Sequence, residues 1–243
     1  MTDPADAPQA RLDDAVFRPL RAGNSLEDTV ARLMQTIKLG VVHPGQTLPS
    51  ERELAVRFSV SRDTVREAIR ELSDAGYLRS RRGRYGGTFV SDPLPEPPVV
   101  PVSPPTPAEL DDLLGLREIL EVGAARSAAS RTLDGEARAL LWTRLGEVSA
   151  ASAPDYRRLD SRLHLTIGEL TGVPSLVTVL ADNRSRINEL LDSFPLLPRN
   201  IEHSNRQHEA IVMAILSGNE DGAAEAVREH LEGSAALLRG FLT

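Results

Sequence analysis

Asp160 and His164 have types and a spacing that could do chemistry. They stand four positions apart in a segment with apolar residues at helical spacing, so both would lie on one helix face, about 6 Å apart along the axis. His208 and His230 fall in two later segments of the same pattern. One carboxylate and three imidazoles suit a borderline divalent cation such as zinc, nickel or manganese. Dispersed histidines are also common as surface or structural residues, so the spacing alone leaves both interpretations open.

A second candidate site is a row of arginines nearer the N-terminus. Arg62, Arg66 and Arg70 recur every fourth residue and would line one side of a helix over about 62–75, with Thr64 near its start. Another side of this helix is apolar and carries Val65, Ala68, Ile69 and Leu72. A lone row of charges is ordinarily a solvated surface. Here a turn and a capped helix precede the row and a basic segment follows it, which favours a nucleic-acid-binding face.

Capping and turn residues predict the elements that position this row. An amphipathic helix is expected over 26–39, with Val30, Leu33 and Ile37 on one face. Ser50 and Glu53 predict a capping box that opens a second helix. The turn over 58–61 follows, and its last residue, Ser61, is expected to cap the third helix. This order of elements predicts a helix-turn-helix.

A basic, glycine-rich segment over 79–87 precedes Thr88, Phe89 and Val90 and predicts a hairpin wing that contacts phosphates or a minor groove. The formal net charge of −7 is unevenly distributed along the chain. Residues 26–90 hold 11 Lys and Arg against 8 Asp and Glu, whereas residues 91–243 hold 14 against 23. We therefore expect a mildly basic DNA-binding head on an acidic body.

Proline marks the boundary between these two parts. Eight of the 17 residues in 91–107 are proline, which favours an extended spacer. A capping box at Thr106 and Glu109 then opens the body. The predicted organisation is a mobile tail (1–25), a winged helix-turn-helix (26–90), a linker (91–106) and an all-helical domain (107–243). Six body helices are expected, over 107–131, 134–152, 155–171, 174–192, 200–217 and 220–242. The fold class is therefore mainly α, with an N-terminal winged helix-turn-helix and a C-terminal all-α helical bundle.

Composition excludes several classes of protein. The chain has no cysteine, which rules out disulfides and thiolate metal sites. A hydrophobic fraction of 41% supports packed cores. No apolar run approaches the roughly 20 residues of a membrane span, and no signal pattern opens the chain. The sequence thus predicts a soluble cytoplasmic protein without a membrane partner.

The segment over 44–90 reads PGQTLPSERELAVRFSVSRDTVREAIRELSDAGYLRSRRGRYGGTFV. It closely resembles the winged helix-turn-helix of the GntR family of bacterial transcription factors. The resemblance implies that Arg52, Arg62 and Arg66 contact phosphates or guanine, that Ser61 and Thr64 support them, and that Arg82 and Gly83 reach a minor groove. Arginine suits both tasks through its charge and its bidentate fork. Asp63, amid these contacts, would accept from a cytosine amine or stabilise the helix N-terminus.

The body resembles the FCD ligand-binding domain of the FadR-type branch. The resemblance rests on LLGLREILEVGAARSAA (113–129), LDSRLHLTIGELTGVPSL (159–176) and RQHEAIVMAILSGNEDGAAEAVREHL (206–231). It implies a metal bound by Asp160, His164, His208 and His230. It also implies an effector-binding arginine at Arg117, and Arg184 is a second candidate. Six predicted helices resemble the shorter, VanR-like branch.

The function expected is a homodimeric regulator, repressing until a small organic acid binds its body and changes its affinity for a double-stranded DNA operator. An octahedral ion would keep two sites open for an effector carboxylate, whereas a tetrahedral zinc would be closed and structural. Two alternatives stay open at this point. One is a metal-dependent hydrolase, although no general base is recognisably placed. The other is an architectural DNA-binding dimer with a structural metal. We expect a regulator and not an enzyme.

Overall fold

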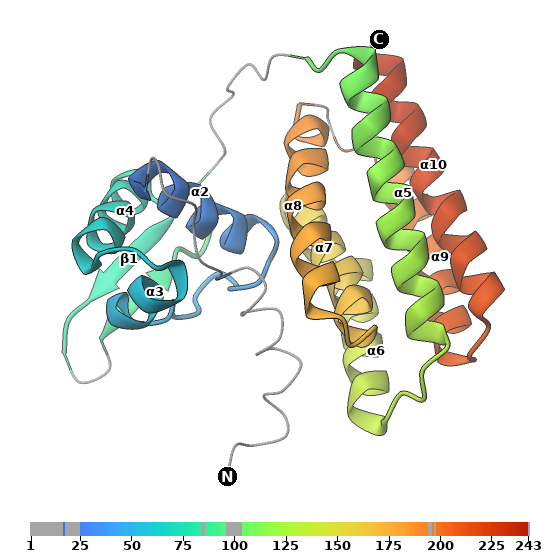
Figure 1. The fold of residues 1–243 in the computed structure, drawn as a ribbon, viewed down its shortest axis with the longest axis horizontal. Coiled ribbons are helices and arrows are strands. Elements are labelled where there is room, and N and C mark those ends of the chain that lie inside the picture. Colours follow the sequence, from blue (N-terminus) through green and yellow to red (C-terminus); the bar gives the residue numbers. More distant parts are fainter. Residues whose placement is uncertain are drawn as a thin grey trace. The chain divides into compact units, whose positions relative to one another are not determined.

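The computed structural model describes residues 17, 25–83, 86–95, 104–193, 196 and 198–242. The described residues up to 95 form one compact unit and those from 104 onward form another (Figure 1). Most of the predicted tail, half of the predicted linker (96–103) and the wing residues 84 and 85 lie outside the described residues. The predicted limits of the tail, the linker and both domains therefore stay predictions.

Three helices make up most of the first unit: α2 (Ser25–Lys38), α3 (Glu51–Phe58) and α4 (Arg62–Asp74). Both α2 and α3 pack against α4 (Figure 1). Their apolar faces supply the core of this unit, together with the ends of the wing strands. The fully buried members of that core include Leu33, Ile37, Leu54, Phe58, Val65 and Ala68. Val30, expected on the buried face of α2, is only half-buried, and Thr29 and Thr36 are buried there instead.

Serine caps fix the turn between α3 and α4. The Ser50 hydroxyl accepts a hydrogen bond from the Glu53 backbone N–H at 3.3 Å, and the Ser61 hydroxyl accepts one from the Thr64 N–H at 3.0 Å. The capping box expected at Ser50 is present only in its first half. The Glu53 carboxylate instead accepts from Arg57 at 2.7 Å, a partner one turn along the same helix. Both helices thus begin where the sequence predicted.

The wing is an antiparallel hairpin of β1 (Leu78–Arg81) and β2 (Gly87–Val90). Leu78 pairs with Val90 at its buried base, and Thr47 adds an isolated bridge to Phe89. Gly83, beyond the end of β1, has a φ of +109°, a conformation that residues with a side chain rarely adopt. The hairpin therefore carries its arginines outward from a buried base.

All the regular secondary structure among the described residues of the second unit is helical. Its helices are α5 (Pro107–Ala129), α6 (Gly135–Ser149), α7 (Ala153–Leu170), α8 (Pro174–Leu191), α9 (Pro198–Leu216) and α10 (Glu220–Leu242). The Thr106–Glu109 capping box opens α5 as predicted. Helix α5 runs beside α10 and also packs against α7, α8 and α9 (Figure 1). The observed architecture, a winged helix-turn-helix and a helical body, confirms the predicted fold class.

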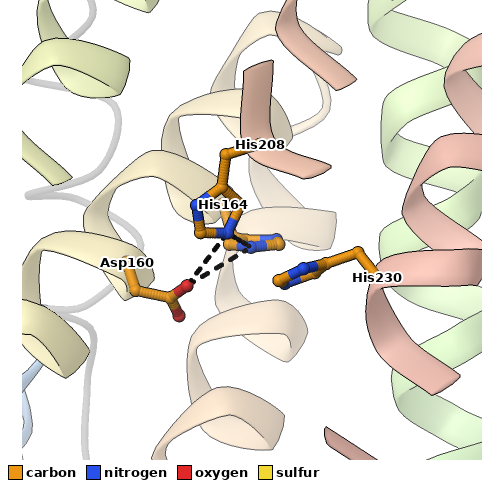
Figure 2. A group of neighbouring side chains, drawn as sticks. All are labelled: Asp160, His164, His208 and His230. Atoms are coloured by element: carbon orange, nitrogen blue, oxygen red, sulfur yellow. Dashed lines mark hydrogen bonds and ion pairs between the residues drawn. The ribbon is translucent and has the colours of Figure 1, made fainter. Parts of the chain in front are cut away.

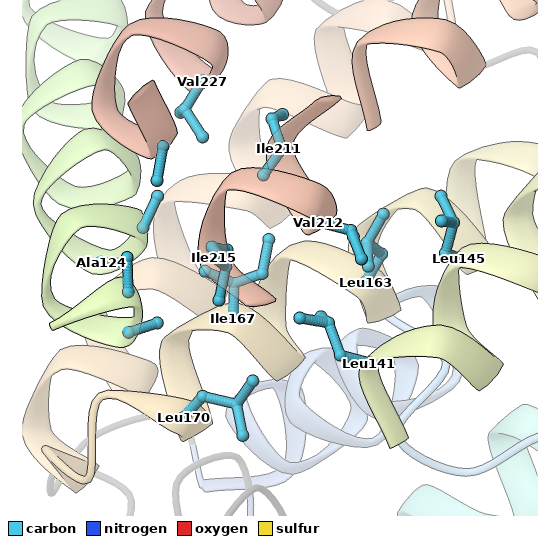
Figure 3. Close-up of a cluster of buried hydrophobic side chains, with 14 of the residues drawn as sticks. Ala124, Leu141, Leu145, Leu163, Ile167, Leu170, Ile211, Val212, Ile215 and Val227 are labelled. Atoms are coloured by element: carbon cyan, nitrogen blue, oxygen red, sulfur yellow. The ribbon is translucent and has the colours of Figure 1, made fainter. Parts of the chain in front are cut away.

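A cluster of aliphatic side chains holds the body helices together (Figure 3). Helix α7 contributes Leu163, Ile167 and Leu170, at the three-to-four spacing that places them on one helix face. Residues of α6, α9 and α10 pack against them, among them Leu141, Leu145, Ile211, Ile215 and Val227. This packing fixes the rotation of α7, α9 and α10 about their axes. It therefore also fixes where their polar residues meet.

Within the residues that the structure describes, no helix combines the length and the apolar character needed to cross a membrane.

Candidate metal centre and nucleic-acid interface

Three body helices bring one carboxylate and three imidazoles to a common point (Figure 2). Asp160 and His164 come from α7, His208 from α9 and His230 from α10. Each offers one ligand atom, and all four atoms lie within 4.8 Å of one another. The three histidines are buried, and the side chain of Asp160 is 15% exposed. The group is therefore a nearly closed cluster of donors inside the bundle.

The distances within this cluster suit a shared divalent ion. Nε2 of His208 lies 3.1 Å from Oδ1 of Asp160, and Nε2 of His164 lies 3.4 Å from Nε2 of His208. A third separation, between His164 Nε2 and Asp160 Oδ1, is 3.8 Å, and all four ligand atoms, that of His230 included, lie within 4.8 Å of one another. Two donors that each sit about 2.1 Å from one ion are about 3.0–3.4 Å apart in octahedral or tetrahedral geometry. The two shorter separations match these values, and the wider ones would have to shorten for all four residues to bind one ion.

Two of the imidazoles are oriented through their outer nitrogens. Nδ1 of His164 lies 2.5 Å from Oε2 of Glu121, and Nδ1 of His230 lies 3.2 Å from Oε1 of Gln207. An acceptor at Nδ1 selects the tautomer that protonates this nitrogen, so Nε2 keeps its lone pair for a cation. Carboxylate and carbonyl partners of this kind are usual for histidines that bind metals.

Two buried arginines surround the cluster and neutralise its carboxylates. Arg184 donates through Nη1 to Oε1 of Glu121 at 2.8 Å and through Nη2 to Oδ2 of Asp160. Arg117 donates through Nε to the same Oε1 of Glu121 at 2.9 Å and through Nη1 to Oγ of Ser234 at 2.7 Å. Two carboxylates and two guanidinium groups thus form one ionic network around the donors.

This network sets the protonation of the donors. Burial opposes charge on Asp160, but Arg184 and the nearby histidines outweigh it and hold the pKa of that carboxyl well below its usual range. The pKa of Glu121 is likewise well below the usual value, because Arg184, His164 and Arg117 overcome its burial. Burial lowers the pKa of His164 and lowers that of His230 well below the usual value. Near neutral pH the carboxylates are charged and these two imidazoles are neutral, the forms that bind cations.

A cavity of about 370 Å³ opens directly beside the cluster. Asp160, His230 and Arg117 line it, so two candidate metal ligands and one buried guanidinium face the same space. Polar side chains that also line it include Tyr156, Asn188, Ser204, Gln207 and Ser234. Its apolar lining includes Leu191, Leu196, Ile201 and Leu237. The cavity therefore suits a small anion with an apolar portion.

In the other unit, α4 presents an exposed basic face. Arg62, Arg66 and Arg70 are all exposed, as is Arg52 on α3. Arg66 pairs with Asp63 at 2.8 Å and with Glu51 at 3.1 Å. Such exposed ion pairs are weak, so a phosphate can replace the carboxylates at little cost. The face has the charge and exposure of a nucleic-acid interface.

Two family models match the two parts of the chain. Residues 26–90 match the model of the bacterial regulatory proteins of the gntR family, and residues 112–233 match that of the FCD domain. The chain is 30% identical over 238 residues to a protein of Escherichia coli (strain K12) assigned provisionally as an L-lactate dehydrogenase operon regulatory protein, covering 93% of this chain and 90% of the relative. The chain belongs to the GntR family.

Further relatives of this GntR-family regulator include repressors and activators. The HTH-type transcriptional repressor NanR of Salmonella arizonae is 30% identical over 238 residues, covering 92% of this chain and 88% of the relative. The Glc operon transcriptional activator of Escherichia coli (strain K12) is 29% identical over 205 residues, covering 79% and 80%. The solved structure of E. coli McbR/YncC shares the fold with a TM-score of 0.54 at 17% identity, covering 89% of this chain and 97% of that one. The protein is therefore a transcriptional regulator and not an enzyme.

The structure brings together all four residues that the sequence singled out as metal ligands, from three different helices. Arg117 lies at the cavity, whereas Arg184 is 1% exposed and bridges Glu121 to Asp160. In the head, Ser61 and Thr64 bond to each other at the start of α4, and their hydroxyl oxygens are 2.8 Å apart. Arg82 and Gly83 are exposed in the wing.

Sequence reasoning missed two residues that orient the histidines, Glu121 and Gln207. Glu121 stands four residues after Arg117 in a helix, which is a signal for an ion pair between them. Gln207 precedes His208 and carries no comparable signal, because its contact with His230 joins two helices that only the tertiary fold brings together.

Proposed function

We propose that this regulator is a homodimeric repressor whose affinity for a double-stranded DNA operator is controlled by a small organic acid bound beside a divalent metal ion. The observation that carries the proposal is the shared cavity. Arg117 faces the same space of about 370 Å³ as Asp160 and His230. Guanidinium groups and divalent metal ions both bind carboxylates. GntR-family regulators bind operators and, through the FCD domain, small effectors.

The metal would be held by Asp160, His164, His208 and His230, which are near one another and carry the required charges. A divalent ion held there would supply positive charge, and a six-coordinate ion would have two positions left for other ligands. The residues of the chain do the rest. Arg117 is the cation for the effector carboxylate, and Arg184 keeps Asp160 charged and oriented. Arg184 thus orients a metal ligand, and Arg117 binds the effector.

The relatives support a carboxylate effector. One relative is described as the regulator of an L-lactate dehydrogenase operon, and the substrate of that enzyme is a small carboxylate. The apolar lining of the cavity accommodates the carbon skeleton of such an acid, while its polar side chains bind its oxygen atoms.

The operator would be read by the head. Arg62 and Arg66 would contact phosphates or guanine from α4, and Arg52 would do so from α3. Ser61 and Thr64 would support these contacts at the start of α4, where a recognition helix meets base edges. Arg82 and Gly83 would enter the minor groove from the wing. A two-fold dimer of such heads matches a palindromic operator.

The test begins with selection of operators from a random duplex pool. Fluorescence anisotropy then measures operator affinity with zinc-loaded protein in the presence of individual organic acids, which are first screened by thermal shift. One acid is expected to raise the melting temperature and to weaken operator binding, since an effector changes an equilibrium only by binding its two states unequally. Light scattering is expected to show a dimer. Absence of sequence-specific binding in every ligand state would overturn the proposal, and tighter operator binding with the acid would overturn the proposed release of the operator by the effector.

A further inference from the structure

Glu121 is a buried carboxylate that the proposed ligand set does not use. Its Oε1 accepts from Arg117 at 2.9 Å and from Arg184 at 2.8 Å, and its Oε2 lies 2.5 Å from Nδ1 of His164. The side chains of Glu121 and both arginines are at most 4% exposed. A carboxylate held in this way acts on three groups at once, and water does not screen it.

The partners of Glu121 lie at two different sites, the cavity and the candidate metal centre. Arg117 lines the cavity, whereas His164 is a candidate metal ligand and Arg184 holds a second one, Asp160. Building on the proposed function, we propose that Glu121 is a positioning residue that couples capture of an anion by Arg117 to the affinity of the metal centre. Metal binding and anion binding then strengthen each other by way of this one side chain.

Competition for Oε1 of Glu121 gives the direction of this coupling. A carboxylate in the cavity attracts the guanidinium of Arg117 and weakens its bond to Glu121. The charge on Glu121 is then more available to the Nδ1 hydrogen of His164, and the imidazole becomes a better donor through Nε2. Anion capture therefore raises metal affinity, and by thermodynamic reciprocity metal binding raises anion affinity to the same extent.

The charge balance of the network points the same way. Two arginines and the two carboxylates Glu121 and Asp160 balance one another when the histidines are neutral. A divalent cation adds two positive charges to a site with little solvent. An anion in the adjoining cavity offsets part of that charge, so each ligand favours the other.

A double-mutant cycle on zinc affinity tests the coupling without any effector. Zn²⁺ dissociation constants are measured by chelator competition for the wild type, Arg117→Met, Glu121→Gln and the double variant. Glu121→Gln is expected to weaken Zn²⁺ binding by about 10–100-fold. Arg117→Met releases Glu121 from one partner and is expected to tighten Zn²⁺ binding by about fivefold or more. In the Glu121→Gln background this gain is expected to disappear.

Arg157→Met is the matched control, because Arg157 also lines the cavity but pairs with Asp192 at 3.0 Å. It removes the same charge, so its effect on Zn²⁺ affinity is expected to be the same with Glu or Gln at position 121. In the Glu121→Gln background, Arg117→Met is expected to have no larger effect than this control. Equal effects of Arg117→Met in both backgrounds, within about twofold, would overturn the coupling.

Glu121→Asp separates positioning from simple structural support. Its shorter carboxylate is expected to restore part of the Zn²⁺ affinity lost in Glu121→Gln, and the cycle is run on Glu121→Asp if the Gln variant does not fold. An unchanged Zn²⁺ affinity in Glu121→Gln contradicts the inference. A wild type that binds no Zn²⁺ overturns both this inference and the proposed metal site. If the wild type binds Zn²⁺ but the effects of Arg117→Met and Glu121→Gln on Zn²⁺ affinity are additive, only the inference is overturned.

Discussion

Nε2 of His208 lies 3.1 Å from Oδ1 of Asp160, although the two residues belong to different helices, α9 and α7. The side chain of His208 is fully buried, whereas that of Asp160 is 15% exposed and lines the cavity. The contact therefore joins the buried side of the cluster to its cavity side. A cation bound between these two atoms would be protected from water on one side and open to a small ligand on the other.

Loss of one donor should therefore abolish tight metal binding. His208→Ala is expected to weaken Zn²⁺ binding by more than about 100-fold, beyond the range that loss of an orienting partner causes. Metal analysis of the purified variant and chelator competition measure the effect. His203→Ala is the control, since His203 is exposed, lies on the same helix and lines the cavity without joining the cluster. Equal losses in both variants would contradict this ligand set.

Acidification should release the metal and destabilise the metal-free protein. Burial lowers the pKa of His164 and His230 from the ordinary value of 6.5, so below about pH 6.5 the unfolded chain binds protons that the folded chain does not. Stability from these residues is complete above that pH and is lost as the pH falls below it. Urea midpoints of chelator-treated protein at pH 7.5 and 5.5 measure this loss.

The matched control for this pH effect is His230→Asn, which removes one of the two imidazoles whose pKa burial lowers. This variant is expected to show a smaller drop in urea midpoint between the two pH values. His203→Ala, which removes an exposed histidine, is expected to keep the wild-type drop. A midpoint that is unchanged or higher at pH 5.5 in the wild type would refute the prediction.

Removal of Arg184 should destabilise the body. Arg184→Met leaves Glu121 without one of its cations and Asp160 without its guanidinium partner, both inside the bundle. Removing one partner of a buried ion pair lowers the free energy of unfolding by about 3–5 kcal/mol. Urea unfolding measures this loss. Arg126→Met removes an arginine that pairs with Asp221 at the surface, and its cost is expected to stay below about 1 kcal/mol. Similar costs for the two variants would argue against the buried network.

Operator binding should depend on Arg62. Arg62→Ala is expected to weaken binding to the selected operator and, if the residue contacts a phosphate, to reduce the slope of log affinity against log salt by about one. Anisotropy titrations at several salt concentrations measure both quantities. Arg126→Ala removes the same charge from the body and is expected to leave the slope unchanged. A wild-type slope in Arg62→Ala would place this residue outside the phosphate contacts.

Local signals in the sequence were sufficient for the elements and for the residue types of both sites. Apolar spacing predicted the helices of head and body, and the Thr106–Glu109 box and the Ser61 cap lie where they were expected. Capping, turn chemistry and helical periodicity act over a few residues, which is why they can be recognised in a chain alone. The capping box predicted at Ser50 was only half correct. The Ser50 hydroxyl caps the helix, but the Glu53 carboxylate accepts from Arg57 on its own helix.

Tertiary structure decided which of these residues meet. His208 and His230 became neighbours of Asp160 because the aliphatic core fixes how α7, α9 and α10 turn toward one another. The same packing placed Glu121 against His164 and left Arg184 as a buried bridge, although the sequence marked it as an effector candidate. Such contacts join residues far apart in the chain, and their distances depend on the packing of whole helices. The sequence by itself therefore determined the family, the elements and the donor types, and the fold determined the network that links them.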